Sequence, residues 1–149
     1  MKSANTFILG MMLLVPALAH ANLPPVADAG EDQTILLFEG INLQGSATDP
    51  DGDPVALTIT SIFQDEPLVN SRETDSCGDG AGVGTEMASV RAASNGAGDG
   101  RVYSIGFTAM DDGGEECSGT VAVCVPHDRG GSDTCVDQGP LFDSTDCDS

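Results

Sequence analysis

Apolar and polar residues alternate with a period of two along most of the chain after residue 22. Val55, Leu57 and Ile59 alternate with polar or small residues, and the pattern recurs in other short segments. Their apolar faces are Ile35 with Leu37, Ile41 with Leu43, Ala88 with Val90 and Ala92, Tyr103 with Ile105, Phe107 and Ala109, and Val121 with Val123 and Val125. No long apolar stripe with the helical period follows the first residues. Short strands between Gly-, Asp- and Pro-rich turns predict an all-β antiparallel sandwich of about seven strands.

The first 21 residues carry the features of a secretory signal peptide. Lys2 gives a positive start, residues 7–15 form an apolar run, and Ala19-His20-Ala21 is a small-x-small cleavage site. The apolar run is too short to span a bilayer, and the alternative of a buried N-terminal helix fits poorly with Pro16. Cleavage after Ala21 leaves residues 22–149, enough for one domain. We therefore expect a secreted, extracellular or periplasmic protein without membrane insertion.

The charge of the exported part is strongly negative. Without Lys2 the chain has four arginines against 24 acidic residues, a net charge of −20. Such a charge argues against nucleic acid or an anionic membrane surface as a partner. It keeps a protein soluble and destabilises its compact state through self-repulsion, which bound divalent cations would relieve.

All five cysteines lie in the exported part: Cys77, Cys117, Cys124, Cys135 and Cys147. Export makes disulfides the first interpretation, and zinc is disfavoured because no Cys-x-x-Cys occurs. Cys117 shares the odd parity of the apolar face that ends at residue 125, so we expect it to point inward and to pair with Cys77. Cys124 points outward and is expected to pair with Cys135, which leaves Cys147 free or intermolecular. A slip in strand register would exchange these assignments.

The run Asp49-Pro50-Asp51-Gly52-Asp53-Pro54 places three carboxylates in one turn before a strand. Oxygen-rich turns of this kind suit Ca²⁺, which takes six to eight oxygen ligands. The competing interpretation is a tight turn in which Asp side chains cap backbone N–H groups. The pattern does not decide between them. An EF-hand is excluded, since the sixth and twelfth positions counted from Asp49 are Pro54 and Thr60.

Three stretches taken together resemble the bacterial polycystic-kidney-disease-like (PKD-like) and cadherin-like extracellular modules. They are Asn22-Leu23-Pro24-Pro25-Val26-Ala27-Asp28-Ala29-Gly30, Gly45-Ser46-Ala47-Thr48-Asp49-Pro50-Asp51-Gly52-Asp53, and Tyr103-Ser104-Ile105-Gly106-Phe107-Thr108-Ala109-Met110-Asp111-Asp112-Gly113-Gly114. The resemblance covers residues 22–125 and implies one immunoglobulin-like (Ig-like) sandwich with Greek-key connections. Residues 126–149 lie outside it and are expected to form an irregular, acidic, Cys-containing extension.

The resemblance also implies a calcium site. Similar modules bind the ion with carboxylates of the Asp-x-Asp-Gly turn and of the strand end, here Asp49, Asp51 and Asp111, with Asn22 as a weaker candidate. Asp53 and Asp112 are neighbouring substitutes, and we take Asp53 into the expected metal set. The chain departs from the family in lacking the Trp-Asp-Phe-Gly-Asp-Gly stretch and any tryptophan. It also carries one copy only, so interdomain calcium sites have no partner domain.

No pattern of an enzyme is evident. His127 is the only histidine after the leader, and no nucleophile-elbow sequence accompanies it. The Gly-rich segments 80–84 and 96–100 are not followed by the Lys-Ser/Thr of a phosphate loop. A glycosidase carboxylate pair is not excluded among so many acids, but the aromatic platforms of a sugar site are scarce.

The sequence therefore predicts a secreted non-catalytic Ig-like module with structural Ca²⁺ and an adhesive or other interaction role. Its expected partner is an extracellular protein or glycan of unknown identity. The alternative is a protein- or glycan-binding module in which metal plays no part. An enzyme would require perturbed carboxylates in a polar pocket, with Asp65, Glu66 and Glu86 as the residues to inspect.

Overall fold

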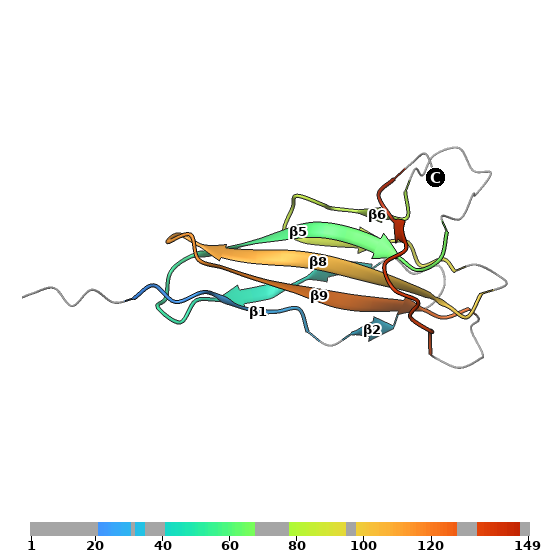
Figure 1. The fold of residues 1–149 in the computed structure, drawn as a ribbon, viewed down its shortest axis with the longest axis horizontal. Helices are drawn as coiled ribbons and strands as arrows, with labels where there is room; N and C mark the ends of the chain where they lie inside the picture. Colours follow the sequence, from blue (N-terminus) through green and yellow to red (C-terminus); the bar gives the residue numbers. More distant parts are fainter. Residues whose placement is uncertain are drawn as a thin grey trace, which may run out of the picture.

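The computed structural model describes residues 21–30, 32–34, 41–67, 78–94, 98–127 and 134–146, and these contain ten β-strands (Figure 1). The strands are β1 (Val26–Asp28), β2 (Gln33–Thr34), β3 (Ile41–Gln44), β4 (Ser46–Thr48), β5 (Val55–Gln64), β6 (Gly80–Ala81), β7 (Met87–Val90), β8 (Arg101–Asp111), β9 (Glu116–Val125) and β10 (Phe142–Asp143). None of the described segments forms a helix long and apolar enough to cross a membrane. Residues 1–20 of the predicted leader and the predicted strand face at Ile35 and Leu37 lie outside the described residues.

The strands form two layers. One sheet has the order β10-β5-β8-β9-β2, and the long strands β5, β8 and β9 lie side by side in it (Figure 1). The other layer consists of the pair β1-β4 and the sheet β3-β7-β6, in which only Gly45 separates β3 from β4. All pairs are antiparallel except β2 with β9. The predicted all-β Ig-like sandwich is therefore confirmed, and the strand count exceeds seven because several strands are very short.

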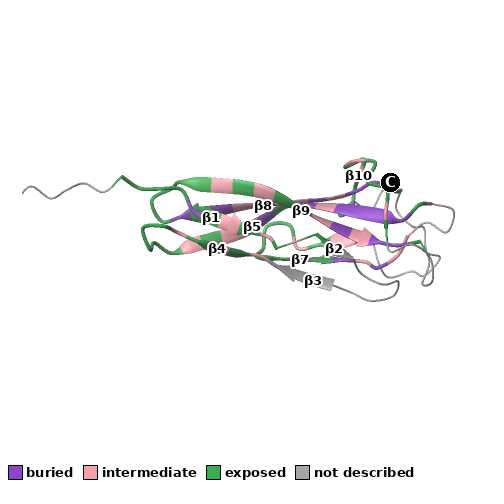
Figure 2. Cartoon of the chain, turned by 90° about the horizontal axis from the view of Figure 1, so that it is seen from below, coloured by how far each residue is buried: buried purple, intermediate pink, exposed green. Residues whose placement is uncertain are grey.

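The core lies between the layers and is densest toward one end. Its buried side chains come from β5, β7, β8 and β9 and from Ala92, which follows β7. They are Ile59, Ile62, Ala88, Val90, Ala92, Tyr103, Ile105, Phe107, Val121, Val123 and Val125. These residues include the apolar faces that the period-two pattern predicted for β7, β8 and β9. Along β9 the buried positions begin only at Val121, so the end near Glu116 is more exposed than the end near Val125 (Figure 2).

A β-bulge interrupts the pairing of β5 with β8. Ile59 faces Phe107 and Ser61 faces Gly106, so Thr60 is the extra residue. A Cβ on Gly106 would come within 2.6 Å of the Ser61 hydroxyl, so a larger residue opposite the bulge would require the Ser61 side chain to move. The bulge changes the parity of β5, so that Ile62 is buried although the alternation through Ile59 placed it on the outer face.

The segment after residue 134 packs against the sandwich as an additional edge strand. Strand β10 pairs with the end of β5, and the Ser144 amide donates to the Ile62 carbonyl at 2.9 Å. The Ser144 carbonyl accepts from the amides of Asp79 and Gly80 at 2.7 and 2.9 Å. This short strand thus links the two layers at one end of the molecule. A disulfide between Cys124 and Cys135 holds the segment to β9, which confirms that predicted pair.

The predicted Cys77–Cys117 pair is wrong, because Cys117 is a free, half-buried thiol. Cys117 lies opposite Ala109 near the β8–β9 turn. Gly78, by contrast, packs against Ser144 at the other end of β5. Parity indicated the face of the sheet but not the position along it. Cys77 and Cys147 themselves lie outside the described residues.

Loss of the Cys124–Cys135 disulfide should destabilise the protein. The two residues are 11 positions apart, and opening a loop of that size should lower the free energy of unfolding by about 3 kcal/mol. We expect Cys124→Ser/Cys135→Ser to show this loss in urea unfolding under non-reducing conditions. Cys117→Ser is the matched control and should change the value by less than about 0.5 kcal/mol. Equal effects of the two variants would contradict the assignment.

Candidate functional site

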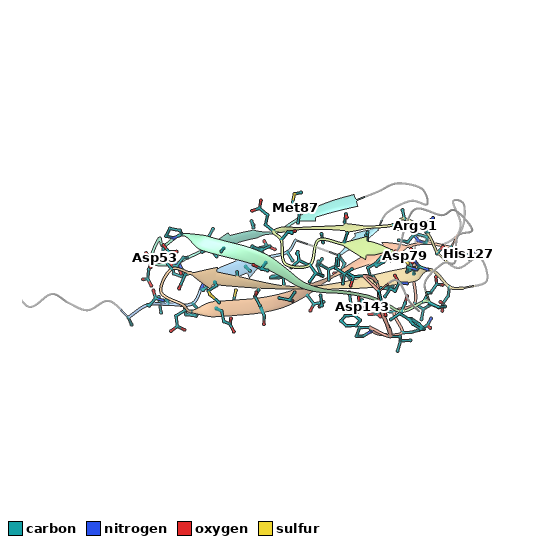
Figure 3. All side chains as sticks on the ribbon, turned by 90° about the horizontal axis from the view of Figure 1, so that it is seen from above. Asp53, Asp79, Met87, Arg91, His127 and Asp143 are labelled. Atoms are coloured by element: carbon teal, nitrogen blue, oxygen red, sulfur yellow. A yellow bond between two sulfur atoms is a disulfide. The ribbon has the colours of Figure 1, made fainter. Side chains whose placement is uncertain are left out.

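The aspartate-rich turn connects β4 with β5 and is closed by Asp49. The Asp49 Oδ1 atom accepts hydrogen bonds from the amides of Asp51 at 2.7 Å and Asp53 at 3.3 Å, and the Gly52 amide donates to the Asp49 carbonyl at 3.2 Å. These are the bonds of the capped turn that formed one of the two sequence interpretations. Asp51 and Asp53 are exposed, and Asp53 lies at the end of the molecule (Figure 3).

Asp111 is the last residue of β8 and lies opposite Val55, the first residue of β5. The residue is only 5% exposed. The Oδ1 atom accepts from the Glu115 amide at 3.0 Å, and Oδ2 accepts from the Asn22 side-chain amide at 3.0 Å. The antiparallel pairing of β5 and β8 therefore brings this carboxylate to the same end as the turn, as the sequence predicted.

The chain entering the sandwich joins the turn to the end of β8. Successive residues reach different carboxylates, since Asn22 binds Asp111 and the Leu23 amide donates to Asp51 Oδ2 at 2.8 Å. Asn22 lies so close to Gly113 that a Cβ there would overlap its amide group. We call the four aspartates 49, 51, 53 and 111, together with residues 22 and 23, the acidic pole.

One buried carboxylate oxygen of the acidic pole has no hydrogen-bond donor. Asp49 Oδ2 is buried and has no hydrogen-bond partner among the described residues. The two arginines of the described part, Arg91 and Arg101, both pair with Asp79 instead. Within the described ranges, however, no three acidic, histidine or cysteine side chains are grouped so that they could hold a metal ion. The predicted ligands share one end of the sandwich without forming a closed coordination site.

A buried polar cluster occupies the opposite end, where β8 begins. Arg101 is fully buried, and its Nη1 lies 2.5 Å from Asp79 Oδ2. Its Nη2 donates to the Pro67 carbonyl at 3.0 Å, and its Nε lies 3.6 Å from Glu66 Oε2. Figure 3 shows Asp79 and Arg91 at this end, far from Asp53. In this cluster a buried guanidinium compensates the buried carboxylates. A buried charge requires an oppositely charged partner of this kind.

Tyr103 belongs to the same cluster and is also fully buried. Its hydroxyl accepts from Arg101 Nη1 at 3.2 Å and donates to the Arg91 carbonyl at 2.8 Å. Burial raises the pKa of Tyr103 to about 12, although the neighbouring Arg101 partly opposes the shift. Burial alone would lower the pKa of Arg101, but Tyr103 and Asp79 outweigh it and the pKa is raised. The guanidinium therefore stays charged in the folded protein.

The carboxylates singled out for possible catalysis do not converge. Asp65 and Glu66 are buried, and Asp65 Oδ1 accepts from the Val102 amide at 2.9 Å. Glu86 is exposed before β7, and His127 is exposed after β9. An open hollow next to Asp79 is lined by residues 78–81 and 89–91. These carboxylates have structural partners or face solvent rather than a shared cleft.

Sequence reasoning missed the buried cluster around Arg101, although a signal was present. Arg101 has the same parity as Tyr103 and Ile105, so the alternation of β8 already placed it on the core face. An arginine in phase with a core face needs a carboxylate partner. Asp79 could not be identified, because it follows a long Gly- and Asp-rich connection without periodicity.

Comparisons with models of known protein families and with curated proteins give no match. Among solved structures the chain is similar to the solution structure of the PKD domain from KIAA 1837 protein. The identity is 19%, the alignment covers 71% of this chain and 90% of that chain, and the TM-score is 0.38. The sandwich fold itself follows from the strand pairing.

The titration of Tyr103 should report directly on the buried cluster, because it is the only tyrosine in the chain. Its folded pKa of about 12 lies above the unfolded value of about 10, so only the unfolded state loses the proton between these values. The free energy of unfolding should therefore fall by about 2 kcal/mol from pH 10 to pH 12, and the tyrosine should change it very little below about pH 9.

Tyrosinate absorbance gives the folded midpoint, and urea unfolding gives the free energy at each pH. Tyr103→Phe is the matched control, since it removes the titrating group and keeps the ring. The difference between wild type and this variant should carry the pH dependence. A folded midpoint near pH 10 would show that Tyr103 is accessible and would contradict the structure.

Proposed function

We propose that the chain is an exported, non-catalytic Ig-like module that Ca²⁺ stabilises at the acidic pole and that serves extracellular contacts. The observation that carries the proposal is the buried Asp49 Oδ2 atom, which has no donor, in a turn that also contains two exposed carboxylates. Carboxylates that are close together repel one another unless a cation or water screens them. The arginines that the structure describes pair at the other end and do not supply that cation.

The residues at the acidic pole match the chemistry of Ca²⁺. Asp49, Asp51, Asp53 and Asp111 offer carboxylate oxygens, the ligands that this hard cation prefers. The Leu23 amide occupies only one lone pair of Asp51 Oδ2, and Asp49 Oδ2 accepts no hydrogen bond from the described residues. An ion bound here would tie the β4–β5 turn to the end of β8. Backbone carbonyls and water would complete its coordination.

Export is supported by the leader pattern and by the disulfide. A Cys124–Cys135 bridge persists in an oxidising compartment and is rare in the cytosol. The net charge of the mature chain, −20, keeps such a protein soluble and away from anionic surfaces. An adhesive or structural contact with an extracellular protein or glycan is the role that these features support together.

A second candidate is a binding module in which metal plays no part. It is favoured by the hydrogen bonds that the pole already makes, because Asp111 accepts one donor on each carboxylate oxygen. In this case the entry segment closes the acidic pole by itself. The two candidates differ in their response to calcium.

Addition of about 10 mM CaCl₂ should raise the melting temperature of the mature protein by about 4–10 °C. This range follows from the millimolar or tighter affinity of extracellular calcium modules and from the size of the domain. Excess EGTA should reverse the shift, and the same concentration of MgCl₂ should give a smaller one. Differential scanning calorimetry measures all three.

Variants decide whether the shift comes from the acidic pole. Asp49→Asn and Asp111→Asn each remove one charge and keep a hydrogen-bond acceptor, so both should abolish most of the calcium shift. Glu86→Gln removes an exposed charge before β7 and should retain it. If wild type shows no shift, the metal-independent module is the correct alternative. A shift that survives in both Asp variants would place the ion elsewhere.

A further inference from the structure

Asn22 and Leu23, the first residues after the predicted leader, are hydrogen-bonded to aspartates of the acidic pole. The Leu23 amide lies 2.8 Å from Asp51 Oδ2, and the Asn22 side chain lies 3.0 Å from Asp111 Oδ2. Backbone nitrogens of successive residues are at most about 3.7 Å apart, so the Asn22 nitrogen lies within about 6.5 Å of the Asp51 carboxylate. This nitrogen belongs to the Ala21–Asn22 peptide bond, which is the predicted cleavage point of the leader, and both residues are exposed.

Cleavage changes the charge at this point. In the precursor the Asn22 nitrogen is part of a neutral amide. A hydrolase of the signal-peptidase class would add water across the bond, which leaves a carboxylate on Ala21 and an ammonium group on Asn22. The carboxylate departs with the leader, and the positive charge stays on the chain that enters the sandwich.

We infer that the α-ammonium group of mature Asn22 acts as a built-in cation of the acidic pole, so that removal of the leader stabilises the fold. The ligand is the chain's own end, and covalent geometry together with the bonds of Asn22 and Leu23 already places it there. Asp49 Oδ2, buried without a donor, belongs to the same pole. This inference does not depend on Ca²⁺ being bound.

The composition makes this one charge important. The only lysine is Lys2, inside the predicted leader, so the mature chain has four arginines and no lysine. The α-ammonium is then its fifth positive charge and its only primary amine. Both arginines in the described ranges pair with Asp79, about 30 Å away along β8. The new N-terminus is therefore well placed to neutralise the acidic pole.

The absence of lysine also provides a specific test. The precursor is expressed with its leader so that export removes it. The mass of the purified protein should then correspond to a chain that begins at Asn22. Acetylation with an N-hydroxysuccinimide ester then removes the charge of the single amine, and hydroxylamine removes any ester formed on hydroxyl groups. In EGTA, we expect acetylation to lower the melting temperature by about 3 °C or more, and less in about 0.5 M NaCl.

A thermodynamic cycle that combines acetylation with the Asp51→Asn substitution separates this effect from a general loss of charge. Acetylation should lower the melting temperature clearly less in Asp51→Asn than in wild type, whereas Glu86→Gln should behave like wild type. A mass that begins elsewhere, a shift below about 1 °C, or equal shifts in all three proteins would each overturn the inference. Because calcium is absent throughout, failure here leaves the calcium proposal intact, and loss of the calcium shift leaves this inference intact.

Discussion

The buried guanidinium of Arg101 is the interaction on which one end of this sandwich depends. It lies between Asp79 and Glu66, on different connections, and is contacted by the Tyr103 hydroxyl. Removing one partner of such a group would leave an uncompensated buried charge, which costs several kcal/mol. The cluster also fixes Asp79, whose amide binds the Ser144 carbonyl, so the edge strand β10 is positioned by the same network.

Positive and negative side chains are therefore distributed unequally between the two ends of the sandwich. The positive side chains that the structure describes are used at the Arg101 end, where they compensate buried carboxylates. The acidic pole, at the far end of β8, satisfies its aspartates with backbone N–H groups and the Asn22 amide. Hydrogen bonds of this kind stabilise carboxylates but do not neutralise them. We propose that a cation, either Ca²⁺ or the processed N-terminus, supplies this neutralisation.

Much of the fold could be predicted from alternation alone, because the strands β5, β7, β8 and β9 each have buried positions. The faces of β8 and β9 were correct, and so was the outward position of Cys124 that led to its pairing with Cys135. The bulge at Thr60 could not be predicted, since an extra residue leaves no compositional signal. Cys117 was assigned a wrong partner because parity gives no position along a strand. The predicted aspartates do lie at one end, but their hydrogen bonds to residues 22 and 23 required the three-dimensional structure.

The most direct test of the account is an amide NMR titration of the ¹⁵N-labelled mature protein with CaCl₂. If the acidic pole is the cation site, the largest shifts should fall on the backbone amides of Leu23, Asp49, residues 51–53 and residues 111–115 and should saturate at one ion per chain. The amides around Arg101 and Asp79 should hardly move, because that end is already compensated. Small shifts spread over all exposed carboxylates, without saturation, would contradict the account.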